Sequence, residues 1–161
     1  MIFGIETACL CLLFWLMCFL GTGTDEKNIK GIDSYPDEVI KIVKGNSKLR
    51  DKIQLTPAWM KPLTNLVLFT VVLFILCFFI KGDTFLYNFL AVLIMGQILN
   101  LFDLLVIDLL WWRNTKRIRF EGTKDDRSLY SSPKKHIISF LKAIVLFTIV
   151  ALIDGGLLLV F

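Results

Sequence analysis

The stretch FLYNFLAVLIMGQILNLFDLLVIDLLWW, residues 85–112, is the longest apolar block of the chain and contains no basic residue. A helix needs about 20 apolar residues to cross about 30 Å of hydrocarbon, so this block is long enough. Only helices and closed barrels satisfy their backbone polar groups in lipid, and the block lacks the alternation of polar and apolar residues that barrel strands need. It therefore predicts a transmembrane helix.

Three further apolar blocks have comparable lengths, at residues 2–20, 63–80 and 137–161. The composition also indicates a membrane protein. Of the residues, 56% are hydrophobic, and the mean hydropathy is +0.70; both values are well above those of a typical soluble protein. We therefore predict an all-α integral membrane protein, in which four transmembrane helices form a single domain over residues 1–161. We expect the chain to be a multi-pass protein of the cell membrane.

The first block has a second interpretation, as a cleaved signal peptide, because the small residues Gly21, Thr22 and Gly23 follow it. A signal peptide begins with basic residues, and none is present here. Glu6 also interrupts the apolar run. Both features favour a retained helix.

The distribution of basic residues predicts the orientation. Lysine and arginine are concentrated in the polar segments 21–62 and 113–136, whereas the turn between the second and third blocks has only Lys81, close to Asp83. By the positive-inside rule, both polar segments face the cytoplasm and both termini lie outside. Anionic lipid at the cytoplasmic face accounts for the formal charge of +4, so we expect no nucleic-acid partner.

The first cytoplasmic segment contains signals for short amphipathic helices. Residues 34–38 resemble a helix start, Val39 and Val43 share one side of the following turns, and Gly45 offers a stop. A second short helix is predicted over residues 47–53. Two interpretations remain open: a solvated loop with two short helices, or helices that lie on the membrane surface or dock a partner.

The third block carries polar residues on one side. At about 100° per residue of an α-helix, Gln97, Asn100, Asp103 and Asp108 occupy an arc of about 140°. Acidic residues inside a membrane usually pair with another group or mark a pathway. This side of the helix is therefore expected to face protein or water.

Partners for these acids are found in the neighbouring blocks. At the start of the fourth block, polar residues recur at every third position. One of them is Lys142, and helix geometry permits an ion pair between it and Asp103. The predicted intramembrane polar cluster consists of Asn65, Gln97, Asn100, Asp103, Asp108, His136, Ser139 and Lys142. It is interpreted either as a set of structural hydrogen bonds between helices or as a site for proton relay, ion passage or acid–base chemistry.

Two acids lie towards the outer side, Glu6 in the first block and Asp154 in the fourth. Gly155 and Gly156 follow Asp154, and small residues allow close helix approach. We expect each acid to be hydrated near the outer surface. The alternatives are a place against a neighbouring backbone or the wall of an outward vestibule.

The sequence contains no nucleophile motif, nucleotide-binding signature or metal-ligand spacing, so no metal or cofactor is expected. This favours a non-enzymatic assembly or accessory subunit, whose polar helix faces pack with a second copy or with a partner membrane subunit. The first alternative is a small transporter or channel lined by Asp103, Asp108 and Lys142. The second is a membrane enzyme for a lipid-linked substrate, with an intramembrane aspartate as acid or base and the basic segments holding a phosphate headgroup.

Overall fold

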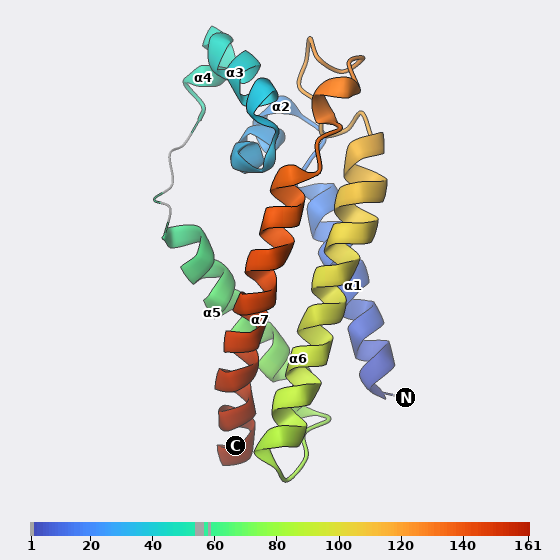
Figure 1. The fold of residues 1–161 in the computed structure, drawn as a ribbon, viewed down its shortest axis with the longest axis vertical. Helices are drawn as coiled ribbons and strands as arrows, with labels where there is room; N and C mark the ends of the chain where they lie inside the picture. Colours follow the sequence, from blue (N-terminus) through green and yellow to red (C-terminus); the bar gives the residue numbers. More distant parts are fainter. Residues whose placement is uncertain (1, 54–56, 58) are drawn as a thin grey trace. The chain divides into compact units, whose positions relative to one another are not determined.

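The computed structural model describes residues 2–53, 57 and 59–161, and within these residues all regular structure is helical (Figure 1). Four helices are long and apolar enough to cross a membrane: Ile2–Leu20, Met60–Phe78, Phe85–Trp112 and Ser128–Val160. The prediction of an all-α, multi-pass membrane protein with four such helices is confirmed. Residues 54–56 and 58 of the predicted segment 21–62 lie outside the described residues.

The described residues form ten helical segments. In chain order they are α1 (Ile2–Leu20), α2 (Asp25–Asn28), η1 (Ile29–Ser34), α3 (Asp37–Gly45), α4 (Ser47–Arg50), α5 (Met60–Phe78), α6 (Phe85–Phe102), η2 (Asp103–Trp112), η3 (Ser128–Tyr130) and α7 (Lys134–Val160).

The turn between α5 and α6 is closed by side chains that bond to the main chain. Asn88 accepts a hydrogen bond from the Gly82 N–H at 2.8 Å and donates one to the Gly82 carbonyl at 3.1 Å. The Thr84 hydroxyl accepts a bond from the Tyr87 N–H, as an N-terminal cap does. The bond to Tyr87 satisfies an N–H that a helix start would otherwise leave unpaired, and the bonds to Gly82 fix the turn that precedes the helix.

The chain divides into two compact units. Unit 1 takes the described residues of Met1–Cys11, Thr56–Phe102 and Phe140–Phe161, and unit 2 takes Leu12–Leu55 and Asp103–Ser139. Three of the boundaries fall inside the long apolar helices, and the fourth falls between α4 and α5. The single domain expected over residues 1–161 stays a prediction.

Unit 1 is held together by apolar packing between α5, α6 and α7. The helices approach closely at Gly96 of α6, where a Cβ atom would lie 2.6 Å from the ring of Phe147 in α7. The ring of Phe69 in α5 meets the same phenylalanine edge to face, with 4.9 Å between centroids. A small residue at a helix crossing therefore brings two membrane helices together, as is common in lipid.

Unit 2 has an aromatic core that joins the two polar segments of the sequence. The Tyr35 ring lies 5.1 Å from the rings of both Trp112 and Phe120, and the Tyr35 hydroxyl donates a hydrogen bond to the Ile118 carbonyl at 2.8 Å. Because the segments before α5 and after η2 contact each other, they lie on the same side of any membrane that the long helices cross. The core consists of Ile29, Ile32, Tyr35, Val39, Val43, Leu49, Trp112, Ile118, Phe120 and Tyr130.

The short helices α3 and α4 supply one wall of this core. Val39 and Val43 of α3 are fully buried in it, and Leu49 of α4 is buried beside them. Lys41 and Lys44, on the other side of α3, are exposed. The apolar side of these helices is therefore occupied by protein.

Candidate functional site

Asp108 and His136 form a buried polar pair between the membrane helices of unit 2. A carboxylate oxygen of Asp108 lies 2.9 Å from Nδ1 of the imidazole. The side chains are only 16% and 6% exposed, respectively. The pair joins η2 to the start of α7, where Trp112 places its ring edge-on to the imidazole at 4.8 Å.

The helix geometry around Asp108 differs from the expectation. Residues Asp103–Trp112 form a π-helix, whereas the predicted polar arc assumed α-helical geometry throughout. In an α-helix, residues five apart lie about 140° from each other around the axis. A π-helix bonds each N–H to the carbonyl five residues back, which brings such residues to the same side. The wider turn thus allows Asp103 and Asp108 to face the protein together.

Two further groups share this environment. Asp103 lies within electrostatic range of both Asp108 and His136, and Cys18 of α1 lies within the same range of both aspartates. Nε2 of His136 is buried and has no hydrogen-bond partner among the described residues. An imidazole held at Nδ1 by a carboxylate, with Nε2 unoccupied, has the orientation that general acid–base catalysis and proton transfer require.

Gln97 and Asn100 of α6 have a different role, in unit 1. The Gln97 amide donates to the Ile144 carbonyl of α7 at 3.2 Å. The Asn100 amide donates to the Phe140 carbonyl and to the Gln97 side chain, both at 3.3 Å. These bonds connect α6 to the main chain of α7, so the two amides act as links between helices.

Other members of the predicted polar cluster are exposed. Asn65 lies on the exposed side of α5, and Ser139 and Lys142 lie on exposed positions of α7. Asp103 belongs to unit 2 and Lys142 to unit 1, so the ion pair between them stays a prediction.

Glu6 and Asp154, the two acids expected towards the outer side, lie in unit 1, and Asp154 is buried where hydration was expected. Its side chain is 0% exposed, and neither carboxylate oxygen has a hydrogen-bond partner among the described residues. The reason is the close helix approach at the adjacent Gly155, where a Cβ atom would lie only 3.2 Å from Phe85 and Phe89 of α6. Glu6 is partly buried, with one carboxylate oxygen unpaired among the described residues.

A basic pocket in unit 2 was not predicted from the sequence. It has a volume of about 540 Å³ and contains four basic and two acidic side chains. The GTGT sequence after the first apolar block lacks the lysine that a phosphate loop requires, yet two of its residues line this pocket. The lining residues are Gly23, Thr24, Asp25, Lys116, Arg117, Arg119, Glu121 and Lys124.

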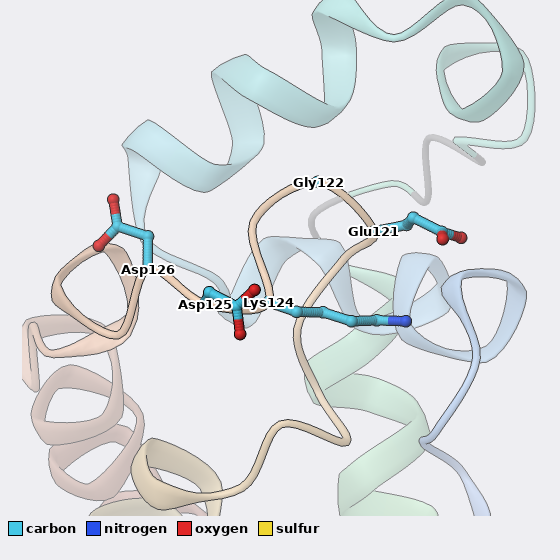
Figure 2. Close-up of a pocket in the computed structure, with 5 residues that line it drawn as sticks. All are labelled: Glu121, Gly122, Lys124, Asp125 and Asp126. Carbon is cyan, nitrogen blue, oxygen red and sulfur yellow. The ribbon is translucent and has the colours of Figure 1, made fainter.

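A second hollow lies along the loop after η2 and has an acidic lining (Figure 2). Figure 2 shows Glu121 and Lys124 reaching to one side of the loop, while Asp126 lies at its other end. Two of its three acids already have partners: Lys116 pairs with Asp125 at 2.6 Å, and Ser128 donates hydrogen bonds to Asp126. These contacts lower the pKa of both carboxyl groups. The acidic hollow is therefore a solvated turn.

Within the described residues, no group of three or more His, Cys, Asp or Glu side chains is arranged to hold a metal ion. No protein-family model matches the chain, and neither a curated protein nor a solved structure matches it.

Proposed function

We propose that this protein is an accessory or assembly subunit of the cell membrane, with both polar segments in the cytoplasm and both termini outside. Its docking surface is the exposed side of α7 around Lys142, and its partner is a membrane helix that carries a carboxylate. The observation that supports this is a lysine on the side of α7 that no other described part of unit 1 covers.

The packed side of α7 is defined by its buried residues, among them Phe147 and Ala151. At about 100° per residue, Lys142 lies about 140° from Phe147 and about 180° from Ala151 around the helix. It is surrounded on this side by the exposed apolar residues Leu141, Val145 and Ile149. Lys142 therefore points away from the helices of its own unit.

A lysine in this position is costly if it faces lipid. The cost near the centre of a membrane helix is about 2.5 to 3.5 kcal/mol on insertion scales. Lys142 lies about 7.5 Å along the helix from Ile137, at 1.5 Å per residue, which is inside the apolar part of α7. A carboxylate on a partner helix would offset this cost, because charged residues in membranes pair with one another.

Site-specific photocrosslinking tests this docking surface. A photoreactive amino acid at Val145 is expected to give one discrete protein adduct in native membranes. Lys142→Met, which removes the charge but keeps an extended side chain, should abolish the adduct, and Lys142→Arg should restore it. Lys81→Met is the matched control, because Lys81 is exposed in the turn between α5 and α6. Lipid adducts alone, or an adduct insensitive to Lys142→Met, would refute the proposal.

The proposed orientation has its own test. Reporter domains fused after Gly45 and after Asp125 are expected to report a cytoplasmic location, and a fusion after Gly82 an external one. An external reading after Gly45 would contradict this orientation, and would favour either a cleaved signal peptide or an inverted first helix.

A second candidate function, acid–base chemistry or proton relay, is favoured by the buried pair of Asp108 and His136. His136→Gln removes the titrating group and keeps an amide near the carboxylate. If this pair is chemically active, His136→Gln should fail to complement deletion of the protein in its host while its thermal melting and its Val145 adduct are unchanged. Full complementation by His136→Gln would exclude this second function.

A further inference from the structure

The basic pocket of unit 2 lies at the end of a membrane helix. Arg117 donates a hydrogen bond from Nε to the carbonyl of Phe19, and Lys27 donates one from Nζ to the carbonyl of Leu20, the last residue of α1. The ends of transmembrane helices lie at the depth of lipid headgroups, because an α-helix of 19 residues spans about the thickness of the hydrocarbon core. The pocket is thus located where phosphate groups of lipids are concentrated.

Arg117 is held in place from three sides. Its guanidinium lies over the ring of Phe19, 4.0 Å from the centroid, and its Nε bonds to the Phe19 carbonyl. Gly23 has a φ of +112°, and a Cβ atom there would lie 2.7 Å from the guanidinium carbon. A glycine is therefore required for the guanidinium to lie against this part of the backbone.

Arg119 is unusual because its side chain is charged and almost entirely buried. The residue is 4% exposed, its Nη1 donates to the Lys124 carbonyl at 2.7 Å, and its guanidinium lies 5.7 Å from the ring centroid of Tyr130. Its Nε is buried without a hydrogen-bond partner among the described residues. Buried charges are normally paired, so this arginine favours an anion in the pocket.

The acids of the pocket leave its positive charge in excess. Among the described residues, neither Arg117 nor Arg119 has a carboxylate within ion-pair distance. Asp25 accepts bonds from the Glu121 N–H, which uses its carboxylate within the loop. The pocket is lined by four basic and two acidic side chains, and Lys116 already pairs with Asp125 at 2.6 Å, so one positive charge remains in excess.

From these observations we infer that the pocket binds the phosphate group of an anion at the membrane surface, either an anionic phospholipid headgroup or free inorganic phosphate. Arginine recognises phosphate oxygens through two parallel hydrogen bonds, and Lys124 adds an exposed positive charge at the rim. This site is on a different unit from the α7 docking surface and does not depend on the proposed function.

The test uses the purified full-length chain in phosphatidylcholine nanodiscs. Phosphatidylglycerol is added in one series and inorganic phosphate in another, and the unfolding temperature of unit 2 is followed by tryptophan fluorescence. A ligand that binds the folded state raises this temperature in a saturable way. Saturation with phosphatidylglycerol alone identifies a lipid headgroup as the ligand, whereas saturation with inorganic phosphate as well identifies free phosphate as a sufficient one.

Two pocket variants and one control make the result specific. Lys124→Gln should weaken binding about fivefold, which corresponds to about 1 kcal/mol for one basic residue at an anionic surface. Arg117→Lys keeps the charge and loses the planar donor fork, so it should also weaken binding. Lys48→Gln removes the same charge from an exposed position of α4 outside the pocket and should leave the affinity unchanged.

Two outcomes would overturn the inference. The first is the absence of a saturable shift with either ligand in the wild-type protein. The second is an equal loss of affinity in Lys124→Gln and Lys48→Gln, which would indicate a general surface-charge effect. If Arg117→Lys fails to fold, Lys124→Gln decides the question alone, because Lys124 is exposed and its replacement leaves the packed part of the pocket intact.

Discussion

Units 1 and 2 differ in how they pack and in how they bury polar groups. In unit 1, Gln97 and Asn100 donate to main-chain carbonyls of α7, and close packing at Gly96 holds the helices together. In unit 2, an aromatic core around Tyr35 joins distant polar segments, and a carboxylate pairs with an imidazole. Lipid offers no hydrophobic driving force between helices, so unit 1 depends on close fit, whereas the polar segments of unit 2 have apolar side chains to remove from water.

The largest effect on stability is expected from Tyr35→Ala, which disrupts the aromatic core that distinguishes unit 2 from unit 1. The change removes a ring that is 3% exposed and contacts three other aromatic rings, and it leaves the Ile118 carbonyl unpaired. The free energy of unfolding should fall by about 3 to 5 kcal/mol, as for other large aromatic truncations. Denaturant titration in detergent micelles, followed by tryptophan fluorescence, measures this loss.

Phe79→Ala is the control for Tyr35→Ala, because Phe79 is 74% exposed in unit 1. Hydrogen exchange should show that Tyr35→Ala loosens α3 and α4 while the amides of α5 stay protected. Equal loss of protection in α5 would mean that the two units unfold together.

A somewhat smaller effect is expected from Asp108→Ala. It leaves His136 buried without the carboxylate that holds Nδ1, and breaking a buried pair costs about 3 kcal/mol or more. Asp108→Asn should cost less, because the amide oxygen still accepts a hydrogen bond from Nδ1. Thermal unfolding compares the variants.

The matched control is the neighbouring ion pair between Lys135 and Asp37, 2.8 Å apart with the aspartate 82% exposed. Asp37→Ala should change stability little, because exposed ion pairs contribute little in water. Similar losses in Asp37→Ala and Asp108→Ala would show that burial does not distinguish the two pairs.

Unit 1 is tested by glycine substitutions in its helices. Gly96→Ala places a methyl group 2.6 Å from the Phe147 ring, and overpacking of this kind costs about 1 to 3 kcal/mol. Gly156→Ala, in α7, meets no described atom within 4 Å and should be neutral or slightly stabilising. Resistance to unfolding by SDS measures both. If Gly156→Ala is the more damaging of the two, the crossing at Gly96 is not what holds α6 against α7.

The smallest effect is expected from Gln97→Leu, which removes the interhelical hydrogen bond to the Ile144 carbonyl and the bond from Asn100 within α6, while Asn100 keeps its bond to the Phe140 carbonyl. Interhelical hydrogen bonds in membranes contribute about 0.6 kcal/mol on average, so the same SDS assay should detect only a slight loss. A loss of stability as large as that caused by Asp108→Ala would show that the amides of unit 1 do more than connect two helices.

Much of the fold was predictable because membrane insertion depends on local sequence. Each apolar block had to become a helix, since the backbone has no other way to satisfy its polar groups in lipid. The π-helix from Asp103 onward was not predictable, because the same residues are compatible with an α-helix. The choice between them depends on which neighbours each aspartate meets.

The candidate site was predictable in its residues and not in its pairing. Asp108 and His136 both belong to the predicted intramembrane polar cluster, but their pairing was not predicted, and the expected pair of Asp103 with Lys142 stays a prediction. The sequence did not indicate the pocket arginines, because Arg117 and Arg119 look like part of an ordinary solvated basic segment. Their role depends on contacts that only the fold makes, with Phe19, Gly23 and Tyr130.

The sequence by itself determined that the chain is helical and of the multi-pass membrane type. The reason is that membrane insertion of a helix depends on the hydrophobicity of about 20 consecutive residues, which is a local property. Only the tertiary structure decided that Tyr35 meets Trp112 and Tyr130, that Asp108 meets His136, and that Asp154 is buried. These contacts join residues far apart in the chain. They form because apolar and charged groups find their lowest free energy against particular neighbours, and only folding brings those neighbours together.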